Sequence, residues 1–281
     1  MLVLVVGVMA TGVHADAQEW TELFNGKNLR GWKKLDGTAD YRVEDGMIIG
    51  TSETGTPNTF LATKEEYGDF ILEYEMKMDR GLNSGVQFRS RATRPDGTER
   101  VNGYQVECDD HNDRPWAGGI YEEADRGWLY PMAYHMEVTK HNKRGEWNSI
   151  RVEAVGNTIR TYINGVNFAN LVDDDREKGF IALQVHGIGN NTELAGKEIR
   201  WRNIRILTEE PSEYIWTGKK LSPEVSYLTN ELTAHQKEEG WKLLWDGRTT
   251  GGWRGARLDH FPEKGWVIKD GVLSVEASGG A

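Results

Sequence analysis

The sequence is poor in cysteine, proline and basic clusters. Among 281 residues there are 7 prolines, 1 cysteine and no run rich in lysine and arginine. The lone Cys108 excludes an intrachain disulfide, and strand alternation places it on a core face, which favours an inert packing thiol over a nucleophile. With 34 basic and 44 acidic residues, the formal net charge of −10 repels nucleic acid and anionic membranes. We therefore expect no nucleic-acid partner.

Long apolar segments are also scarce. The apolar run at residues 2–10 is too short to span a membrane, and no other segment approaches the length of a transmembrane helix. Small residues at alternate positions follow this run between 13 and 17, which is typical of a cleavage site. Residues 1–18 are therefore predicted to be a signal peptide, implying a periplasmic or secreted protein with no membrane span. A packed N-terminal strand is the alternative.

Glycine and tryptophan are abundant, at 33 and 11 residues, and amphipathic helical patterns are nearly absent. Segments 70–78 and 147–154 instead alternate apolar and polar residues with the period of a strand. Asn164-Gly165 is a strong signal for a tight hairpin. This combination predicts an all-β fold, built as an antiparallel sandwich.

The end of the chain repeats its beginning. Three pairs of segments match in order and spacing: 20–26 with 241–247, 31–32 with 252–253, and 44–48 with 269–273. The pattern predicts one complete domain at 19–207, a linker at 208–240 with a short helix opened by a capping box at Thr233, and a truncated second copy at 241–281. A sheet that lacks most of its strands cannot bury a core, so we expect this fragment to be poorly ordered alone or to belong to a longer chain.

Three predicted strands have unusual polar faces. Residues 84–90, 104–109 and 181–186 each turn apolar side chains to one side, and the opposite faces present Gln87, Arg89, Gln105, Glu107, Asp109, Gln184 and His186. An ordinary solvated face would be rich in lysine, glutamate and threonine. If the three strands share a sheet, these groups converge on a surface suited to binding or catalysis.

The segment 110–146 breaks the regular spacing of strands. It is rich in tryptophan, tyrosine, glutamate and arginine, and a segment this long inside a compact domain usually has a functional role. The side chains from it that could contact a sugar or donate a proton are Tyr121, Glu122, Arg126 and Trp128. Aromatic rings stack on the C–H faces of sugars, although Trp128 could equally anchor the loop.

Several motifs in order resemble one family. They are Gly68-Asp69-Phe70, Asn83-Ser84-Gly85-Val86, Gly103-Tyr104-Gln105-Val106-Glu107, Gly119-Ile120-Tyr121, Gly145-Glu146-Trp147-Asn148, Gly179 to Gly187 and Arg202-Asn203-Ile204. The chain resembles the 3-keto-disaccharide hydrolase family over 19–207, and the resemblance restarts at 241. It implies a concanavalin A-like jelly-roll β-sandwich. It also implies a secreted or periplasmic enzyme that cleaves glycosides whose sugar carries a 3-ketone, as a hydrolase or a 1,2-lyase, with a divalent metal in some members.

A 3-ketone makes the proton on C2 acidic, so a base can form an enediolate and the C1–O bond then breaks by elimination. Water can add afterwards, which gives net hydrolysis. The reaction needs a base, positive charge beside the enediolate and a proton donor. We expect the catalytic groups to be His186, Glu107 and Arg89. The expected substrate-binding groups are Gln87, Gln105, Tyr121, Glu122, Arg126, Trp128 and Gln184.

A divalent cation could supply the positive charge. Glu107, Asp109 and His186 offer oxygen and imidazole ligands, without distinguishing Ca²⁺, Mg²⁺, Mn²⁺ or Zn²⁺. Arg89 could serve instead of a metal, because its guanidinium can clamp oxygens. No organic cofactor is expected, and the expected partner is an oligosaccharide or glycoside substrate.

Structural roles are the alternative for the same residues. Glu107 and Arg89 could form an ion pair, His186 could bond a loop backbone, and Asp109 could cap a turn. An ordinary glycoside hydrolase on this fold would use a second glutamate three positions after Asp109, where this chain has Asn112, which counts against paired carboxylates. A carbohydrate-binding module without turnover is the third possibility.

Overall fold

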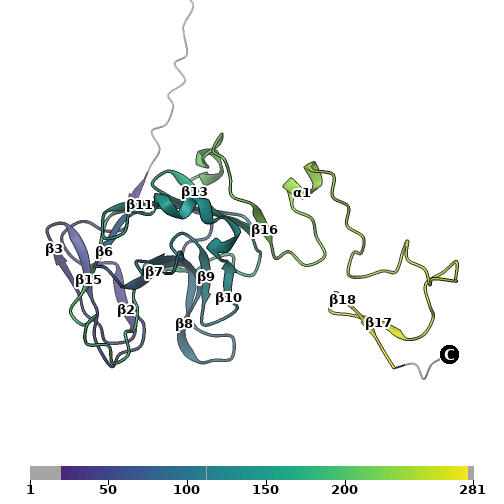
Figure 1. Ribbon diagram of the computed structural model, residues 1–281, viewed down its shortest axis with the longest axis horizontal. Coiled ribbons are helices and arrows are strands. Elements are labelled where there is room, and N and C mark those ends of the chain that lie inside the picture. The colour runs from purple at the N-terminus through teal and green to yellow at the C-terminus, as the bar shows by residue number, and fades with distance from the viewer. Residues whose placement is uncertain (1–19, 112, 278–281) are drawn as a thin grey trace, which may run out of the picture.

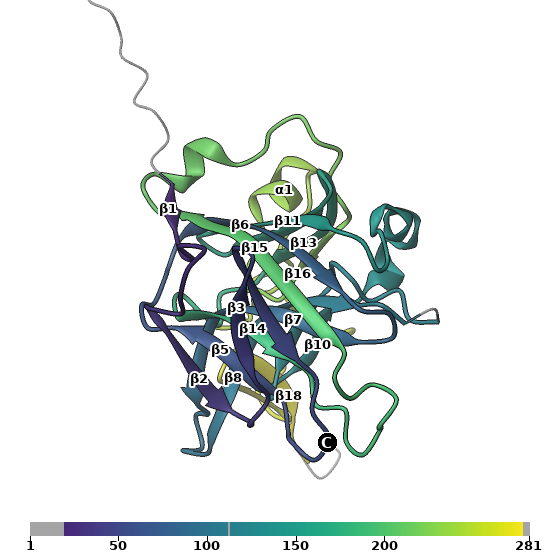
Figure 2. The same ribbon diagram turned by 90° about the vertical axis from the view of Figure 1, so that its left-hand side faces the viewer.

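Two mainly antiparallel sheets pack face to face in the computed structural model, which describes residues 20–111 and 113–277 (Figure 1, Figure 2). The predicted signal peptide at 1–18 lies outside the described residues. In sheet A the order is β16 (Glu224–Ser226), β13 (Val166–Val172), β12 (Thr158–Ile163), β11 (Asn148–Val155), β6 (Phe70–Met78), β15 (Glu198–Leu207), β4 (Met47–Thr51) and β3 (Tyr41–Glu44), with β1 (Thr21–Glu22) also beside β15. In sheet B the order is β10 (Gly127–Tyr130), β9 (Ile120–Glu123), β8 (Glu99–Asp109), β7 (Asn83–Thr93), β14 (Phe180–Val185), β5 (Thr59–Thr63) and β2 (Trp32–Asp36).

Helices are short. The described helical segments are η1 (Met132–Tyr134), η2 (Met136–His141), η3 (Pro211–Tyr214) and α1 (Ala234–Glu238). None in the described part of the chain is long and apolar enough to cross a membrane. The predicted all-β sandwich is confirmed.

The core lies between the two sheets and follows the predicted alternation. Phe70 and Tyr74 of β6 point inward from sheet A, and Phe88 and Tyr104 point inward from sheet B. The ring centroids of Phe70 and Phe88 are 6.3 Å apart in an edge-to-face contact, a favourable geometry for aromatic pairs. Cys108 belongs to the same core, and burial raises the pKa of its thiol, so it is a packing residue as predicted.

Sheet B curls strongly. Its strand β8 is separated from β2 by three strands, yet the Val101 N–H of β8 donates to Asp36 Oδ2 of β2 at 2.9 Å. A second, smaller apolar cluster fills the curl on the face turned away from the main core, and it comprises Phe60, Ala62, Val101, Phe180 and Ala182. The outer face of sheet B is therefore closed at one end of its strands and cannot be a flat solvated surface.

Residues 208–240 wrap around the sandwich. Strand β16 pairs in parallel with β13, and the Trp216 ring lies 4.9 Å from that of Tyr162. Helix α1 has the predicted capping box, in which the Gln236 N–H donates to Thr233 Oγ1 at 3.0 Å. The predicted linker thus extends sheet A by one strand.

The C-terminal segment repeats local details of the first strands. The indole N–H of Trp32 donates to the Leu23 carbonyl at 2.9 Å, and that of Trp253 donates to the Leu244 carbonyl at 2.7 Å. Strands β17 (Trp266–Lys269) and β18 (Val272–Val275) pair only with each other and stand apart from the sandwich in Figure 1. A truncated second domain stays a prediction.

Arg89 does not lie on the polar face, which corrects the prediction for this residue. The pairing of β7 with β8 shifts between Phe88 and Arg91, and Arg89 adopts a φ of 46°. Its side chain is 1% exposed and ion-pairs with Asp69 at 2.9 Å. The guanidinium also donates to four backbone carbonyls, those of Gly68, Ala154, Gly156 and Arg176. Arg89 ties loops together and is unavailable to a substrate.

We predict that Arg89→Ala destabilises the fold, because it leaves these carbonyls without their donor. The expected loss in the free energy of unfolding is on the order of 3–5 kcal/mol, measured by urea denaturation. Arg91→Ala, an exposed arginine two positions later, is the control and should change stability by less than about 0.5 kcal/mol. Equal effects of the two substitutions would contradict this role.

Candidate functional site

The three polar strands of the sequence lie next to one another in sheet B, as expected. Their order is β8, β7, β14, and the register places Gln105 opposite Gln87 and Glu107 opposite Gly85. Tyr121 of β9 continues the row beside Gln105. This polar face comprises Asn83, Gln87, Gln105, Glu107, Asp109, Tyr121, Glu123, Gln184 and His186.

Glu107 lies at the centre of the polar face and is only 4% exposed. Its carboxylate accepts hydrogen bonds from the side-chain amides of Asn83 and Gln105, the latter at 2.9 Å. Burial raises the pKa of Glu107 to about 7, and the two amide donors oppose that rise. A carboxyl group that titrates near neutral pH can act as an acid or as a base under physiological conditions.

A chain of hydrogen bonds fixes the orientation of Glu107. The Ser90 hydroxyl donates to Gln87 Oε1 at 2.7 Å, and Gln87 Nε2 donates to Gln105 Oε1 at 2.8 Å. Gln105 then donates to Glu107, so every amide in the chain has a defined direction. Gly85 makes this possible, because a Cβ there would lie 2.3 Å from Gln105 Cδ.

The three glutamines were predicted to bind substrate, and the structure corrects this. Gln87 and Gln184 are 0% exposed and Gln105 is 2% exposed, so all three form the floor beneath the surface. Gln87 and Gln105 position Glu107, whereas the Gln184 amide has no hydrogen-bond partner among the described residues. The curl of sheet B buries them, and alternation alone cannot reveal that curl.

Asp109 accepts three kinds of donor. Asn83 Nδ2 donates to it at 3.0 Å, the His111 N–H at 2.8 Å, and Arg114 lies 3.3 Å from Oδ2. The Arg114 guanidinium also stacks over the Trp116 ring, 4.5 Å from its centroid. Asp109 therefore holds a partly exposed guanidinium at the edge of the polar face.

His186 follows β14 and is half-buried. Its Nδ1 lies 2.8 Å from the Gly187 carbonyl oxygen, which can only accept, so Nδ1 holds the proton and Nε2 has the free lone pair. Burial lowers the pKa of His186 below its ordinary value, and the nearby Arg114 charge acts in the same direction. The imidazole is thus neutral at pH 7 and suited to take up a proton.

Aromatic rings form a wall beside these groups. The Trp128 ring centroid lies 5.4 Å from that of Tyr121 and 5.4 Å from that of Trp116, both edge-to-face. Tyr121 neighbours Gln105 across β9 and β8, so the wall adjoins Glu107. Tyr121 of β9 and Trp128 of β10 thus lie beside the polar strands, and their contact with a sugar stays a prediction.

Sequence reasoning missed Glu123 and Arg114. Glu123 shares the face of Tyr121 and is 6% exposed, with Asn58 Nδ2 at 3.3 Å and Arg100 at 3.2 Å from its carboxylate. The short alternation at 120–123 is a signal for this strand, whereas the irregular spacing of 110–146 as a whole favours a long loop. Arg114 stands in an irregular stretch with no periodic signal.

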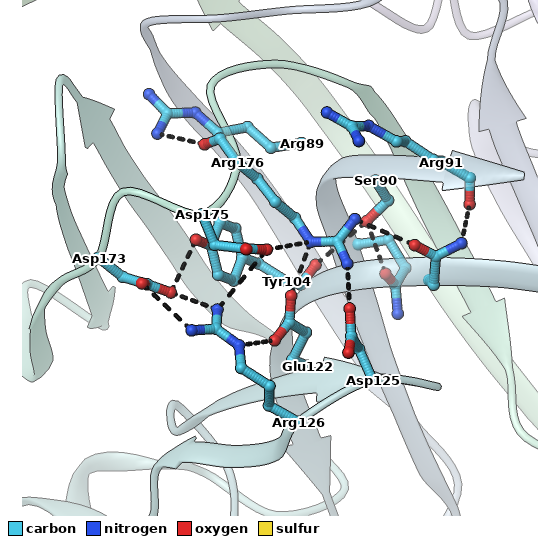
Figure 3. A network of polar contacts seen from close by, with 12 residues as sticks. Arg89, Ser90, Arg91, Tyr104, Glu122, Asp125, Arg126, Asp173, Asp175 and Arg176 are labelled. Atoms are coloured by element: carbon cyan, nitrogen blue, oxygen red, sulfur yellow. Dashed lines mark hydrogen bonds and ion pairs between the residues drawn. The ribbon is translucent and has the colours of Figure 1, made fainter. Parts of the chain in front are cut away.

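Glu122 and Arg126 lie on the opposite side of β9, which corrects their predicted contact with substrate. Glu122 is 0% exposed and ion-pairs with Arg126 and, at 2.6 Å, with Arg176 (Figure 3). Arg126 also pairs with Asp173, which accepts the Tyr104 hydroxyl at 2.8 Å. This buried network joins the end of sheet B to the segment after β13.

One acidic cluster could hold a metal ion. Oxygen atoms of Glu122, Asp125 and Asp175 lie within 4.8 Å of one another. All three carboxylates already approach Arg176, at 2.6, 2.6 and 3.4 Å (Figure 3), so a cation would have to displace its guanidinium.

The predicted metal ligands Glu107, Asp109 and His186 do not converge in this way. Among residues 20–111 and 113–277, no other group of three such ligands has its atoms within 4.8 Å. Glu107 and Asp109 instead face amide and guanidinium donors.

The raised pKa of Glu107 predicts a pH dependence of stability. Between its ordinary value of 4.5 and about 7, the folded state retains a proton that the unfolded state has lost, so stability falls as pH rises through this window. The fall from pH 4.5 to pH 7.5 should be on the order of 3 kcal/mol, measured by urea denaturation. Glu107→Gln should abolish this component, whereas Glu209→Gln, at an exposed position, should retain it.

Comparisons with known proteins agree with the resemblance in the sequence. The family model described as 3-keto-alpha-glucoside-1,2-lyase-like domain matches residues 19–207, whereas no curated protein matches the chain. Two Parabacteroides distasonis structures, both provisionally described as glycosyl hydrolases, are 21% and 24% identical. Their TM-scores are 0.49 and 0.47, and the alignments cover 67% and 68% of this chain and 93% and 99% of theirs.

A carbohydrate-binding module from Bacillus subtilis is 15% identical, with a TM-score of 0.44, and the alignment covers 63% of this chain and 95% of that one. Identities this low concern the fold alone. The family match covers more than half of the chain and the fold agrees with it. The protein is therefore a jelly-roll member of the 3-keto-alpha-glucoside-1,2-lyase-like family.

Proposed function

We propose that this protein cleaves the glycosidic bond of 3-keto-glycosides, in the periplasm or outside the cell, by C2 deprotonation and elimination followed by hydration. The observation that carries the proposal is that His186 and Glu107 lie on one polar face of sheet B, beside an aromatic wall, with the pKa of His186 lowered and that of Glu107 raised to about 7. Family membership supports the substrate class.

The reaction assigns one task to each group. His186 Nε2 takes the proton from C2, the electrons of the C2–H bond form a C2–C3 double bond, and the 3-ketone oxygen takes the negative charge of the resulting enediolate. Arg114, whose charge acts on His186, stabilises the developing negative charge. The C1–O bond then breaks with formation of a C1–C2 double bond, and protonated Glu107 gives its proton to the departing oxygen.

Hydration completes the cycle. Water adds at C1, the imidazolium of His186 returns its proton to C2, and Glu107 regains a proton from the attacking water. The sum is hydrolysis, and release of the unsaturated sugar before water adds would make the same site a lyase. Arg114 thus has the role that the sequence predicts for Arg89, which is to stabilise the negative charge of the enediolate.

The first test compares oxidised and parent substrates. We expect turnover of methyl 3-keto-glucoside and none of methyl glucoside, followed by chromatography of the products. His186→Ala should lower kcat at least about 100-fold, whereas His141→Ala, at an exposed histidine, should not. Turnover of the parent glucoside would indicate an ordinary glycosidase. Binding without turnover, unaffected by His186→Ala, would indicate a binding module.

The second test concerns the acid. Turnover should fall as the pH rises through about 7, because Glu107 loses the proton that it donates. Glu107→Gln should lose activity on methyl 3-keto-glucoside but retain it on the p-nitrophenyl derivative, whose leaving group needs no proton. On that second substrate the loss of activity above pH 7 should disappear. An unchanged pH profile would remove Glu107 from the mechanism.

A third test concerns the cation. Because Glu107, Asp109 and His186 do not converge and Arg114 supplies charge, we expect activity within about twofold of the starting value after EDTA treatment. Inactivation that Ca²⁺, Mg²⁺, Mn²⁺ or Zn²⁺ reverses would instead show that a divalent cation does this task. If EDTA leaves activity unchanged, Arg114→Ala should lose most of its turnover. If a divalent cation is required, Arg114→Ala should not be severely impaired.

A further inference from the structure

A cavity adjoins the polar face at Glu123. It has a volume of about 580 Å³, within the range usual for small-molecule sites. Its lining combines the loop before β5, the start of β8, the end of β9 and the turn after His186, and comprises Asp36, Thr56, Pro57, Asn58, Phe60, Glu99, Arg100, Glu123, Gly187 and Gly189. We call it the side groove.

The side groove meets the polar face at Glu123 and at Gly187, the residue that follows His186. Glu123 lines it and also acts electrostatically on both Glu107 and His186. Asn58 fixes this junction, because its Oδ1 accepts the Gly187 N–H at 2.9 Å while its Nδ2 donates to Glu123 at 3.3 Å. A ligand that reaches from Glu107 into the groove therefore stays in contact with the protein.

The side groove and the aromatic wall share β9, which contributes Glu123 to the groove, and otherwise come from different parts of sheet B. The wall belongs to β9, β10 and the segment before them, whereas the groove involves β5, the end of β2 and the start of β8. A sugar stacked on Trp128 with its C1 and C2 near Glu107 and His186 would direct its other half into the groove. We propose that the side groove is the subsite for the leaving-group sugar, an inference that rests on the proposed function.

The lining chemistry narrows the ligand. Asp36, Glu99 and Glu123 offer carboxylates against the single guanidinium of Arg100, and Phe60 is only 1% exposed. Closely spaced donors and acceptors suit a ligand with many hydroxyl groups, whereas a large apolar group would find little apolar surface. The excess of negative charge disfavours phosphorylated or uronic leaving groups. The ligand class is thus a neutral or amino sugar, linked to the 3-keto sugar in a disaccharide.

The test fills the groove without touching the reacting groups. Glu99→Trp introduces a large ring at an exposed position that lines the groove, and Thr98→Trp places the same ring on the neighbouring exposed position outside it. We expect Glu99→Trp to lower kcat/KM at least tenfold for a 3-keto-disaccharide and to leave methyl 3-keto-glucoside unchanged. Thr98→Trp should alter neither. Thermal denaturation of both variants should match the parent protein.

A binding measurement separates this subsite from the proposed function. Calorimetric titration with cellobiose and with methyl glucoside needs no turnover, and Glu99→Trp should weaken only the disaccharide. Disaccharide affinity and turnover unaffected by Glu99→Trp, or an equal loss for both ligands, would overturn the subsite. If the parent protein turns over neither 3-keto substrate but shows the selective binding loss, the proposed reaction fails while the subsite stands.

Discussion

Removing a carboxyl group from water costs free energy. In sheet B the side chains around the buried Glu107 offset that cost with hydrogen bonds. The sheet curls until the start of β8 bonds to β2, and Glu107 and the glutamines beneath it are buried on its polar face. The carboxyl group is tolerated because two amides donate to it and because Gln87 and Ser90 orient one of those amides. The same desolvation brings its pKa close to neutral. Curvature, the hydrogen-bond chain and the acid–base character of the site are therefore one linked property of the sheet.

Strand β9 has a glutamate on each face. One stabilises the fold through ion pairs, and the other faces the candidate site. Glu122 is buried and points into a network with the buried Arg176 and the partly exposed Arg126, whose guanidinium groups compensate its charge. Its neighbour Glu123 points to the polar face and meets only the exposed Arg100 and the Asn58 amide. Adjacent residues of one type thus have opposite uses, and only the register of a four-residue strand decides which is which.

Much of the fold of the sandwich can be predicted from the sequence, because alternation and turn signals are local properties. Alternation correctly placed Glu107, Asp109 and His186 on one sheet face. It failed at Arg89, where a left-handed backbone conformation and a register shift turn the side chain away, and neither leaves a periodic trace. The burial of the glutamines was equally hidden, since the curl of a sheet depends on contacts between β8 and β2 that are far apart in the chain. Arg114 was missed because its position depends on a pairing with Asp109, not on a strand pattern.

Strand β16 has a consequence for how the domain ends. The family match stops at residue 207, but β13 would then present a free row of backbone N–H and C=O groups along the margin of sheet A. Unpaired margins of this kind recruit strands from other molecules and lead to aggregation. Glu224–Ser226 pairs with Asn170, Leu171 and Val172 of β13, so the outermost strand on this side of sheet A comes from the segment after residue 207. The sheet is thus completed by residues that lie outside the family match.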